Sequence, residues 1–195
     1  GLAVAAVLAA ALAESRPRLG YRVVFAPGTI GSITWLARNA GAAQHIDMGL
    51  VVTTCGGPGA MSTKRSWDER HPINRIINEV LTARGRPFTT YPFDIHGSDE
   101  RQYSSPGFRI NMASIHKDRY YEYPQYHSSA DDLSFVNGGQ LAEALAVHQQ
   151  VIERLEVREV YRRTQAGGEV MLSRHDLYPT DGGAQRPELG GRSEL

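Results

Sequence analysis

Apolar residues recur along residues 1–155 in two alternating spacings, one typical of helices and one typical of buried strands. The helical spacing predicts helices at residues 2–13, 30–38, 73–83 and 140–155. Short apolar or β-branched runs predict strands at residues 21–25, 49–54, 87–93 and 110–115. Strands that alternate with helices favour an α/β fold of three layers, with a largely parallel or mixed sheet flanked by helices.

Prolines and loops refine this picture. Pro87 and Pro92 place the third predicted strand at an edge of the sheet, because proline has no backbone N–H to donate to a neighbouring strand. In such sheets reactive groups gather in the loops beyond the carboxyl ends of the strands. The loops expected to carry chemistry are residues 26–31, 55–60, 96–108 and 120–132.

The chain has 195 residues and is 41% hydrophobic, enough for one substantial core. We expect one α/β domain at residues 1–156 and a tail at residues 157–195 that is rich in glycine and partly disordered. The sequence opens inside a predicted helix, without a methionine or a capping residue. We therefore expect the N-terminal part of the domain, including part of its site, to lie upstream of this chain.

Charge and cysteine content exclude several classes of protein. The 21 basic residues balance the 21 acidic residues, so no net field attracts nucleic acid or an anionic membrane. The single cysteine excludes an intramolecular disulfide and zinc sites built from several cysteines. The apolar residues 1–13 are too few to span a bilayer. We expect a cytoplasmic protein with no membrane contact and no direct nucleic-acid contact.

The segment that is most informative about chemistry is residues 121–136, YEYPQYHSSADDLSFV. In it His127 lies four residues before Asp131, and neutral imidazole is a common zinc ligand. The chain has seven histidines, and any one of them alone is more often a solvated or hydrogen-bonded side chain than a ligand. The setting of His127, between tyrosines and a pair of serines, distinguishes it from the others.

Residues 123–131, YPQYHSSAD, resemble the last metal-ligand motif of the co-catalytic zinc aminopeptidases and their carboxypeptidase relatives. This resemblance implies that His127 binds zinc and that Tyr126 donates a hydrogen bond to the developing oxyanion. A preorganised donor in that place stabilises an oxyanion by about 3 kcal/mol. The alternative, which the residues leave open, is that Tyr126 is a half-buried aromatic residue whose hydroxyl caps the loop.

A second stretch, residues 97–108 with the sequence GSDERQYSSPGF, resembles the Gly/Ser-rich turn that precedes the final histidine loop in the same family. The resemblance implies that Ser98 and Asp99 line the site, facing the substrate or orienting a ligand. Glu100 is the candidate general base, on its proximity to Asp99 alone. A solvated acidic turn is the alternative reading of these residues.

The sequence departs from the active members of the family at two places. Residues 23–36, VVFAPGTIGSITWL, resemble the segment that carries a general-base glutamate and a zinc-ligand glutamate, yet residues 21–36 contain no acid. After the strand at residues 49–54 the family has an aspartate ligand, whereas this chain has Cys55 and a run of glycines. The resemblance still implies one or two zinc ions, with the further ligands expected upstream.

These matches together resemble a bacterial aminopeptidase-like subfamily with a C-terminal winged-helix segment, whose lead-in would be residues 169–178. The leading expectation is a zinc-dependent metallohydrolase that acts on a peptide or amide bond of a small-molecule substrate. The missing glutamates favour a second hypothesis, a catalytically inactive domain of the same fold with a binding or structural role. A plain interaction domain is the third.

Overall fold

The structure is a computed structural model that describes residues 1–161, 164, 167–168, 171 and 174. Its contacts divide the chain into one unit at Gly1–Arg158 and another at Glu159–Leu195. The helices and strands named below all lie in the first unit. The expected lead-in to a winged helix, at residues 169–178, falls almost entirely outside the described residues.

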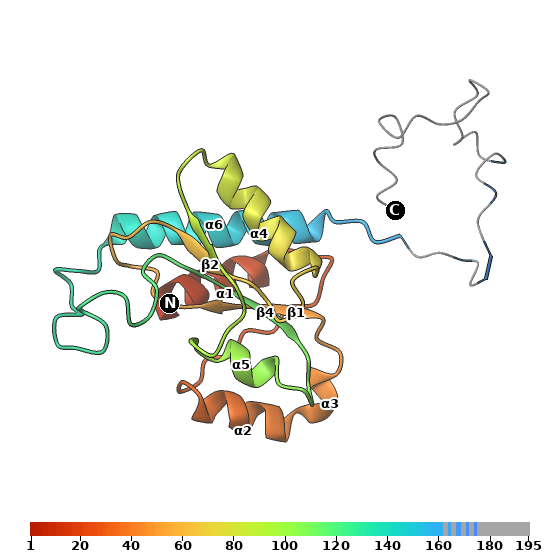
Figure 1. Cartoon of the computed structure of the whole chain (residues 1–195), viewed down its shortest axis with the longest axis horizontal. Coiled ribbons are helices and arrows are strands. Elements are labelled where there is room, and N and C mark those ends of the chain that lie inside the picture. The colour runs from red at the N-terminus through yellow and green to blue at the C-terminus, as the bar shows by residue number, and fades with distance from the viewer. Residues whose placement is uncertain (162–163, 165–166, 169–170, 172–173, 175–195) are drawn as a thin grey trace. The chain divides into compact units, whose positions relative to one another are not determined.

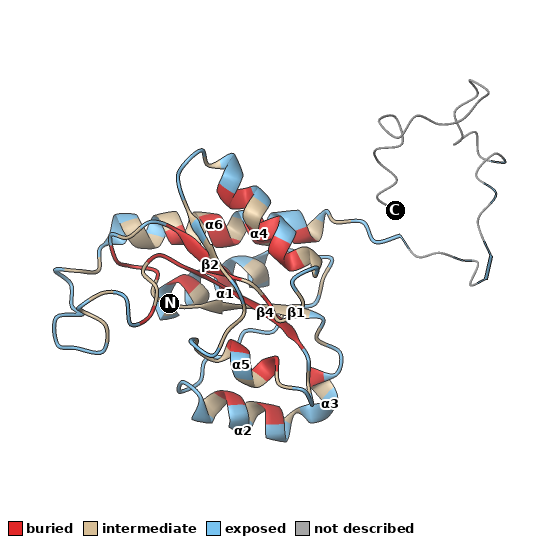
Figure 2. Ribbon diagram, in the orientation of Figure 1, coloured by how far each residue is buried: buried red, intermediate tan, exposed pale blue. Residues whose placement is uncertain are grey.

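The centre of the first unit is a mixed sheet with the strand order β1-β4-β2-β3. Its strands are β1 (Met48–Val52), β2 (Ser62–Lys64), β3 (Thr89–Tyr91) and β4 (Asn111–His116). β1 and β4 are parallel, β2 and β3 are parallel, and β2 runs antiparallel to β4. β4 lies inside the sheet and is buried along its whole length, as Figure 2 shows.

Helices cover both faces of this sheet, so the domain has three layers (Figure 1). One face carries α1 (Leu2–Glu14), α4 (Pro72–Ala83) and α6 (Gly138–Glu156), and the other carries α2 (Ile30–Arg38), α3 (Ala40–Ala43) and α5 (Glu100–Tyr103). On the first face Ile77 of α4 and Val147 of α6 pack against Ile115 of β4, and all three are fully buried. The α/β fold with a mixed sheet between helices is therefore confirmed.

Local capping explains where α4 and α6 begin. α4 begins with Pro72 directly after His71, whose ring nitrogen accepts a hydrogen bond from the Ile73 amide. At the start of α6 the side chain of Asn137 accepts a hydrogen bond from the Gln140 amide. These contacts satisfy amides that have no partner inside the helix, and they fix where the preceding loops end.

The prediction of a strand at residues 21–25 is wrong. This segment forms no strand, and Val23 and Phe25 are 42% and 53% exposed. It is held at the end of α6 instead, where the Tyr21 hydroxyl donates to Oε1 of Glu156 over 2.6 Å. The β-branched residues of this segment predict a buried strand, but the segment is held by a hydrogen bond to α6 and does not pair with the sheet.

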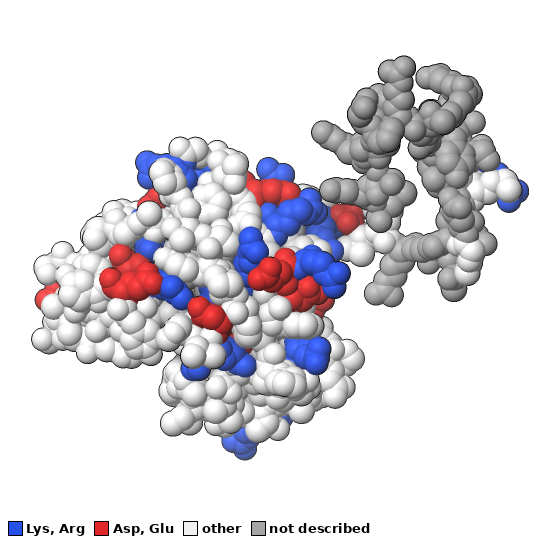
Figure 3. Space-filling view, viewed as in Figure 1, with Lys and Arg blue, Asp and Glu red and all other residues white. Residues whose placement is uncertain are grey.

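The surface of the domain mixes charges of both signs. Figure 3 shows acidic and basic side chains lying side by side on the face turned to the viewer. Among the described residues, no helix combines the length and apolar character needed to cross a bilayer.

Candidate functional site

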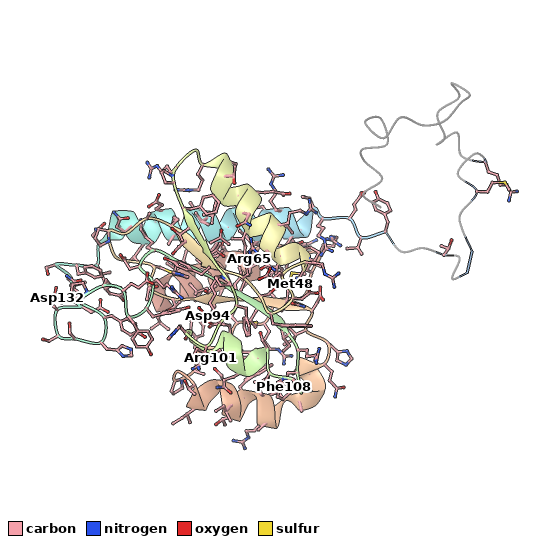
Figure 4. The ribbon with its side chains drawn as sticks, viewed as in Figure 1. Met48, Arg65, Asp94, Arg101, Phe108 and Asp132 are labelled. Carbon is pink, nitrogen blue, oxygen red and sulfur yellow. The ribbon has the colours of Figure 1, made fainter. Side chains whose placement is uncertain are left out.

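The loop that joins β4 to α6 carries the strongest of the predicted site residues. It projects from the end of the sheet, and Asp132 lies in its outer part (Figures 1 and 4). Within this loop His127 is exposed, and its backbone has a φ of 54°. A non-glycine residue in the left-handed region carries strain, and such strain concentrates at functional sites. Thr29, Thr54, Arg109 and Tyr121 share this conformation, so the backbone geometry is compatible with the sequence motif but does not by itself distinguish His127.

Tyr126 joins His127 to a cluster of aromatic rings. The two rings are stacked, with centroids 4.0 Å apart and an angle of 16° between their planes. Edge contacts place Tyr121 and Tyr123 at centroid distances of 4.9 Å and 5.5 Å from Tyr126. Burial is the main cause that raises the pKa of the Tyr126 hydroxyl, with Tyr121 adding to it. Tyr126 thus stays a protonated donor at neutral pH, as the oxyanion role requires.

Glu100, the expected general base, lies in a different setting. Its side chain is 1% exposed, and its Oε1 atom lies 3.1 Å from Nζ of Lys64, which is also 1% exposed. Nζ of Lys64 donates as well to the backbone carbonyls of Asp94 and His96. A general base has to reach water or substrate, and a buried carboxylate in an ion pair does neither. The Glu100 carboxylate thus orders this region, its burial argues against the expected role, and that role stays a prediction.

The turn that precedes Glu100 is organised by this ion pair. The Ser98 amide donates to Oε2 of Glu100 over 3.0 Å, so the backbone of Ser98 is fixed. Oδ1 of Asp99 accepts a hydrogen bond from the Thr29 amide over 2.7 Å. The structure thus joins Ser98 to Glu100, pairs Glu100 with Lys64, and ties Asp99 to the segment before α2.

His116, at the end of β4, and Tyr120, in the loop after it, are buried between residues 97–100 and the aromatic cluster around Tyr126. The Tyr120 ring lies 6.5 Å from Tyr126 and 5.4 Å from His116, measured between centroids. Burial raises the pKa of Tyr120, and the charge of Glu100 raises it further. Burial also lowers the pKa of His116 to about 4, so its imidazole is neutral. Tyr120 therefore lies between the Lys64–Glu100 ion pair and the loop that carries His127.

The donor atoms of the described residues do not by themselves fit a zinc ion. Structural and catalytic zinc sites use at least three protein ligands. Among the described residues, no group of three or more His, Cys, Asp or Glu side chains could hold a metal ion. His127 is one exposed donor, so an ion at His127 would need ligands from beyond the described residues.

Sequence reasoning missed the central member of this region, Lys64. It lies in β2, a strand of three residues that follows a Gly-Pro-Gly run and shows no periodicity of its own. His116 was also missed, because the predicted strand at residues 110–115 ended one residue too early. Tyr120 lies in the expected loop at residues 120–132, but nothing marked it as buried. β4 contains Asn111, Ser114 and His116, so no continuous apolar run indicated that this strand is covered on both faces.

Comparisons with known proteins agree with this fold. The chain is 36% identical over 183 residues to a Clostridium acetobutylicum protein provisionally named a polysaccharide biosynthesis protein with an aminopeptidase-like domain. This match covers 94% of the chain and 42% of the relative. A crystal structure of a protein from the same organism, provisionally assigned as a peptidase, superposes with a TM-score of 0.79 at 36% identity. The superposition covers 89% of this chain and 41% of that one.

The chain thus spans less than half the length of the relative and of the crystal structure. The sequence profile of a family described as a domain of unknown function, DUF4910, matches residues 1–158. This range holds the sheet, both layers of helices and the histidine loop. The chain therefore belongs to the DUF4910 family.

Proposed function

We propose that the full-length protein is a zinc-dependent, aminopeptidase-like hydrolase of peptide or amide bonds, and that His127 is one of its zinc ligands. The observation that carries this proposal is the exposed, left-handed His127 stacked on Tyr126 in the loop after β4. The relative with an aminopeptidase-like domain supports the same class of reaction. Zinc, when bound, would supply a polarising charge for the substrate carbonyl.

The residues of this chain contribute binding and orientation. Tyr126, kept protonated by its surroundings, can donate a hydrogen bond to the oxygen on which charge develops. Asp99 is half-buried beside α2 and can accept from an amine or amide of the substrate. Lys64 and Glu100 hold the turn that presents Ser98 and Asp99. We place the general base outside the described residues.

A catalytically inactive domain with a binding role is the second candidate. It is favoured by the burial of Glu100 in an ion pair and by the lack of an acid at residues 21–36. In that case the aromatic cluster around Tyr126 would serve recognition alone.

Hydrolysis by the full-length protein separates the two candidates. We expect release of amine from aminoacyl anilides or from N-acyl amino sugars, the latter chosen because the relative is named for polysaccharide biosynthesis. A chelator should abolish the activity, and zinc should restore it. His127→Ala should abolish it as well, whereas His45→Ala, at an exposed histidine after α3, should not. An intact fold without turnover on either substrate supports the inactive domain.

A further inference from the structure

A cavity lies between α4, α6 and the loop that enters β2, and it is lined by Lys117, the first residue of the loop that joins β4 to α6. Its volume is about 370 Å³, within the range of small-molecule sites. Lys117, which directly follows β4, and Gly59, in the loop after β1, both line it. The cavity therefore lies beyond the carboxyl ends of two parallel strands, where α/β sheets bind ligands.

The wall of this cavity carries more positive than negative charge. Three cations line it, Arg84, Arg86 and Lys117, together with a single carboxylate, Glu143. Oε1 of Glu143 accepts from Arg84 over 2.7 Å and from Arg86 over 2.9 Å, while Oε2 contacts Lys117. One carboxylate is thus shared by three cations.

Two of the three cations are largely shielded from solvent, whereas Arg86 is 72% exposed. The side chains of Lys117 and Arg84 are 3% and 18% exposed. Lys117 also faces Asp118, whose pKa is raised by burial and which therefore offsets at most one further charge. Two carboxylates thus face three cations, and the remaining positive charge belongs to the exposed Arg86, with which a bound anion can pair.

The remaining wall limits the size and character of such an anion. Met61, Leu81 and Phe88 supply apolar surface, and Gln140 supplies a polar group beside Lys117. A guanidinium group matches the two oxygens of a carboxylate or phosphate. We propose that this cavity binds a small molecule that joins a carboxylate or phosphate group to a compact apolar body, with Arg84 and Arg86 contacting the anion.

The same contacts could also serve only to hold the end of α4 against α6. Binding distinguishes the two roles, and it requires no enzymatic activity. We would titrate the full-length protein by calorimetry with phenyl phosphate, benzoate and benzyl alcohol, three probes that share one apolar body. Binding of either anion, but not of the neutral alcohol, is the expected result. The anion that binds more tightly identifies the phosphate or the carboxylate as the natural group.

Variants then locate the binding. Arg86 is 72% exposed, so Arg86→Gln should leave the fold intact and weaken anion binding about tenfold. Arg84→Gln should weaken it as much or more. The matched control is Arg75→Gln, which removes a cation of α4 that pairs with Glu79 instead. The proposal is overturned if neither anion binds, or if binding persists unchanged in both Arg84→Gln and Arg86→Gln. An equal loss in Arg75→Gln would also overturn it.

Discussion

Nζ of Lys64 lies 3.1 Å from Oε1 of Glu100, and both side chains are almost completely buried. One group comes from β2 and the other from α5, so the pair fastens a helix of the outer layer to the sheet. The two backbone carbonyls that accept from Lys64 fasten the loop after β3 to the same point. The turn that presents Ser98 and Asp99 depends on this arrangement.

Lys64→Met should destabilise the protein by about 3–5 kcal/mol, because it leaves the Glu100 carboxylate buried without its partner. The double variant Lys64→Met with Glu100→Gln should recover part of this loss. Urea unfolding measures both. Arg75→Met, which breaks an exposed pair with Glu79, should cost less than about 1 kcal/mol. A double variant no more stable than Lys64→Met would contradict the ion-pair account.

Gly97 leaves no room for a side chain. A Cβ atom at this position would meet Oε1 of Glu100 and lie 2.6 Å from Nζ of Lys64. Gly97→Ala should therefore push the pair apart and cost about 1–3 kcal/mol in unfolding free energy. A Cβ atom at Gly107 would meet no other atom within 4 Å. Gly107→Ala is therefore the matched control and should change stability by less than about 1 kcal/mol. Equal effects of the two substitutions would count against the crowding at Gly97.

His116 should make stability depend on pH. Its pKa in the folded protein is about 4, because burial and the positive charges of Arg119 and Lys64 lower it. An unfolded histidine has a pKa of about 6.5. As pH falls from about 6.5 to 4, the unfolded chain takes up a proton that the folded chain refuses, so stability is lost by about 3 kcal/mol. Above pH 6.5 this contribution is complete.

Unfolding at several pH values tests this contribution. The free energy of unfolding of His116→Asn should fall less between pH 7 and pH 4.5 than that of the wild type. His148, whose pKa burial also lowers, is present in both proteins and cancels in the difference. His45→Asn, at an exposed histidine, is the matched control and should give the same difference between pH 7 and pH 4.5 as the wild type. Parallel slopes for wild type and His116→Asn would show that His116 does not titrate as described.

Tyr126→Phe tests the oxyanion role within the proposed hydrolase. Removal of one preorganised donor should lower kcat about 10²–10³-fold with little change in KM. Tyr121→Phe is the control, since Tyr121 is 69% exposed and belongs to the same aromatic cluster. If the two variants lose activity equally, or only KM changes, Tyr126 acts in packing or substrate binding.

Much of the fold could be predicted from the sequence because it rests on local signals. The helix at residues 30–38 was predicted with the bounds that the structure gives, and the predicted strand with Pro87 and Pro92 corresponds to the edge strand β3. The missed strand β2 has three residues, too few for a periodic pattern. The false strand at residues 21–25 shows that β-branched residues also occur in segments held by polar contacts.

The candidate site was predicted only where a motif marked it. His127 and Tyr126 are adjacent in sequence, and they are stacked in the structure. The Lys64–Glu100 pair joins residues that are far apart in the chain, and no local spacing predicts such a contact. Glu100 is buried, and burial of an acidic side chain depends on a partner that the sequence does not identify.

The zinc content of the full-length protein tests the central claim most directly. The wild type and the control His45→Ala should retain about one or two zinc ions per chain after dialysis, and His127→Ala should lose at least one of them. Circular dichroism of the three proteins would confirm that they are equally folded. Zinc content that is the same in His127→Ala and wild type, or a wild type without zinc, would contradict the assignment of His127 as a ligand.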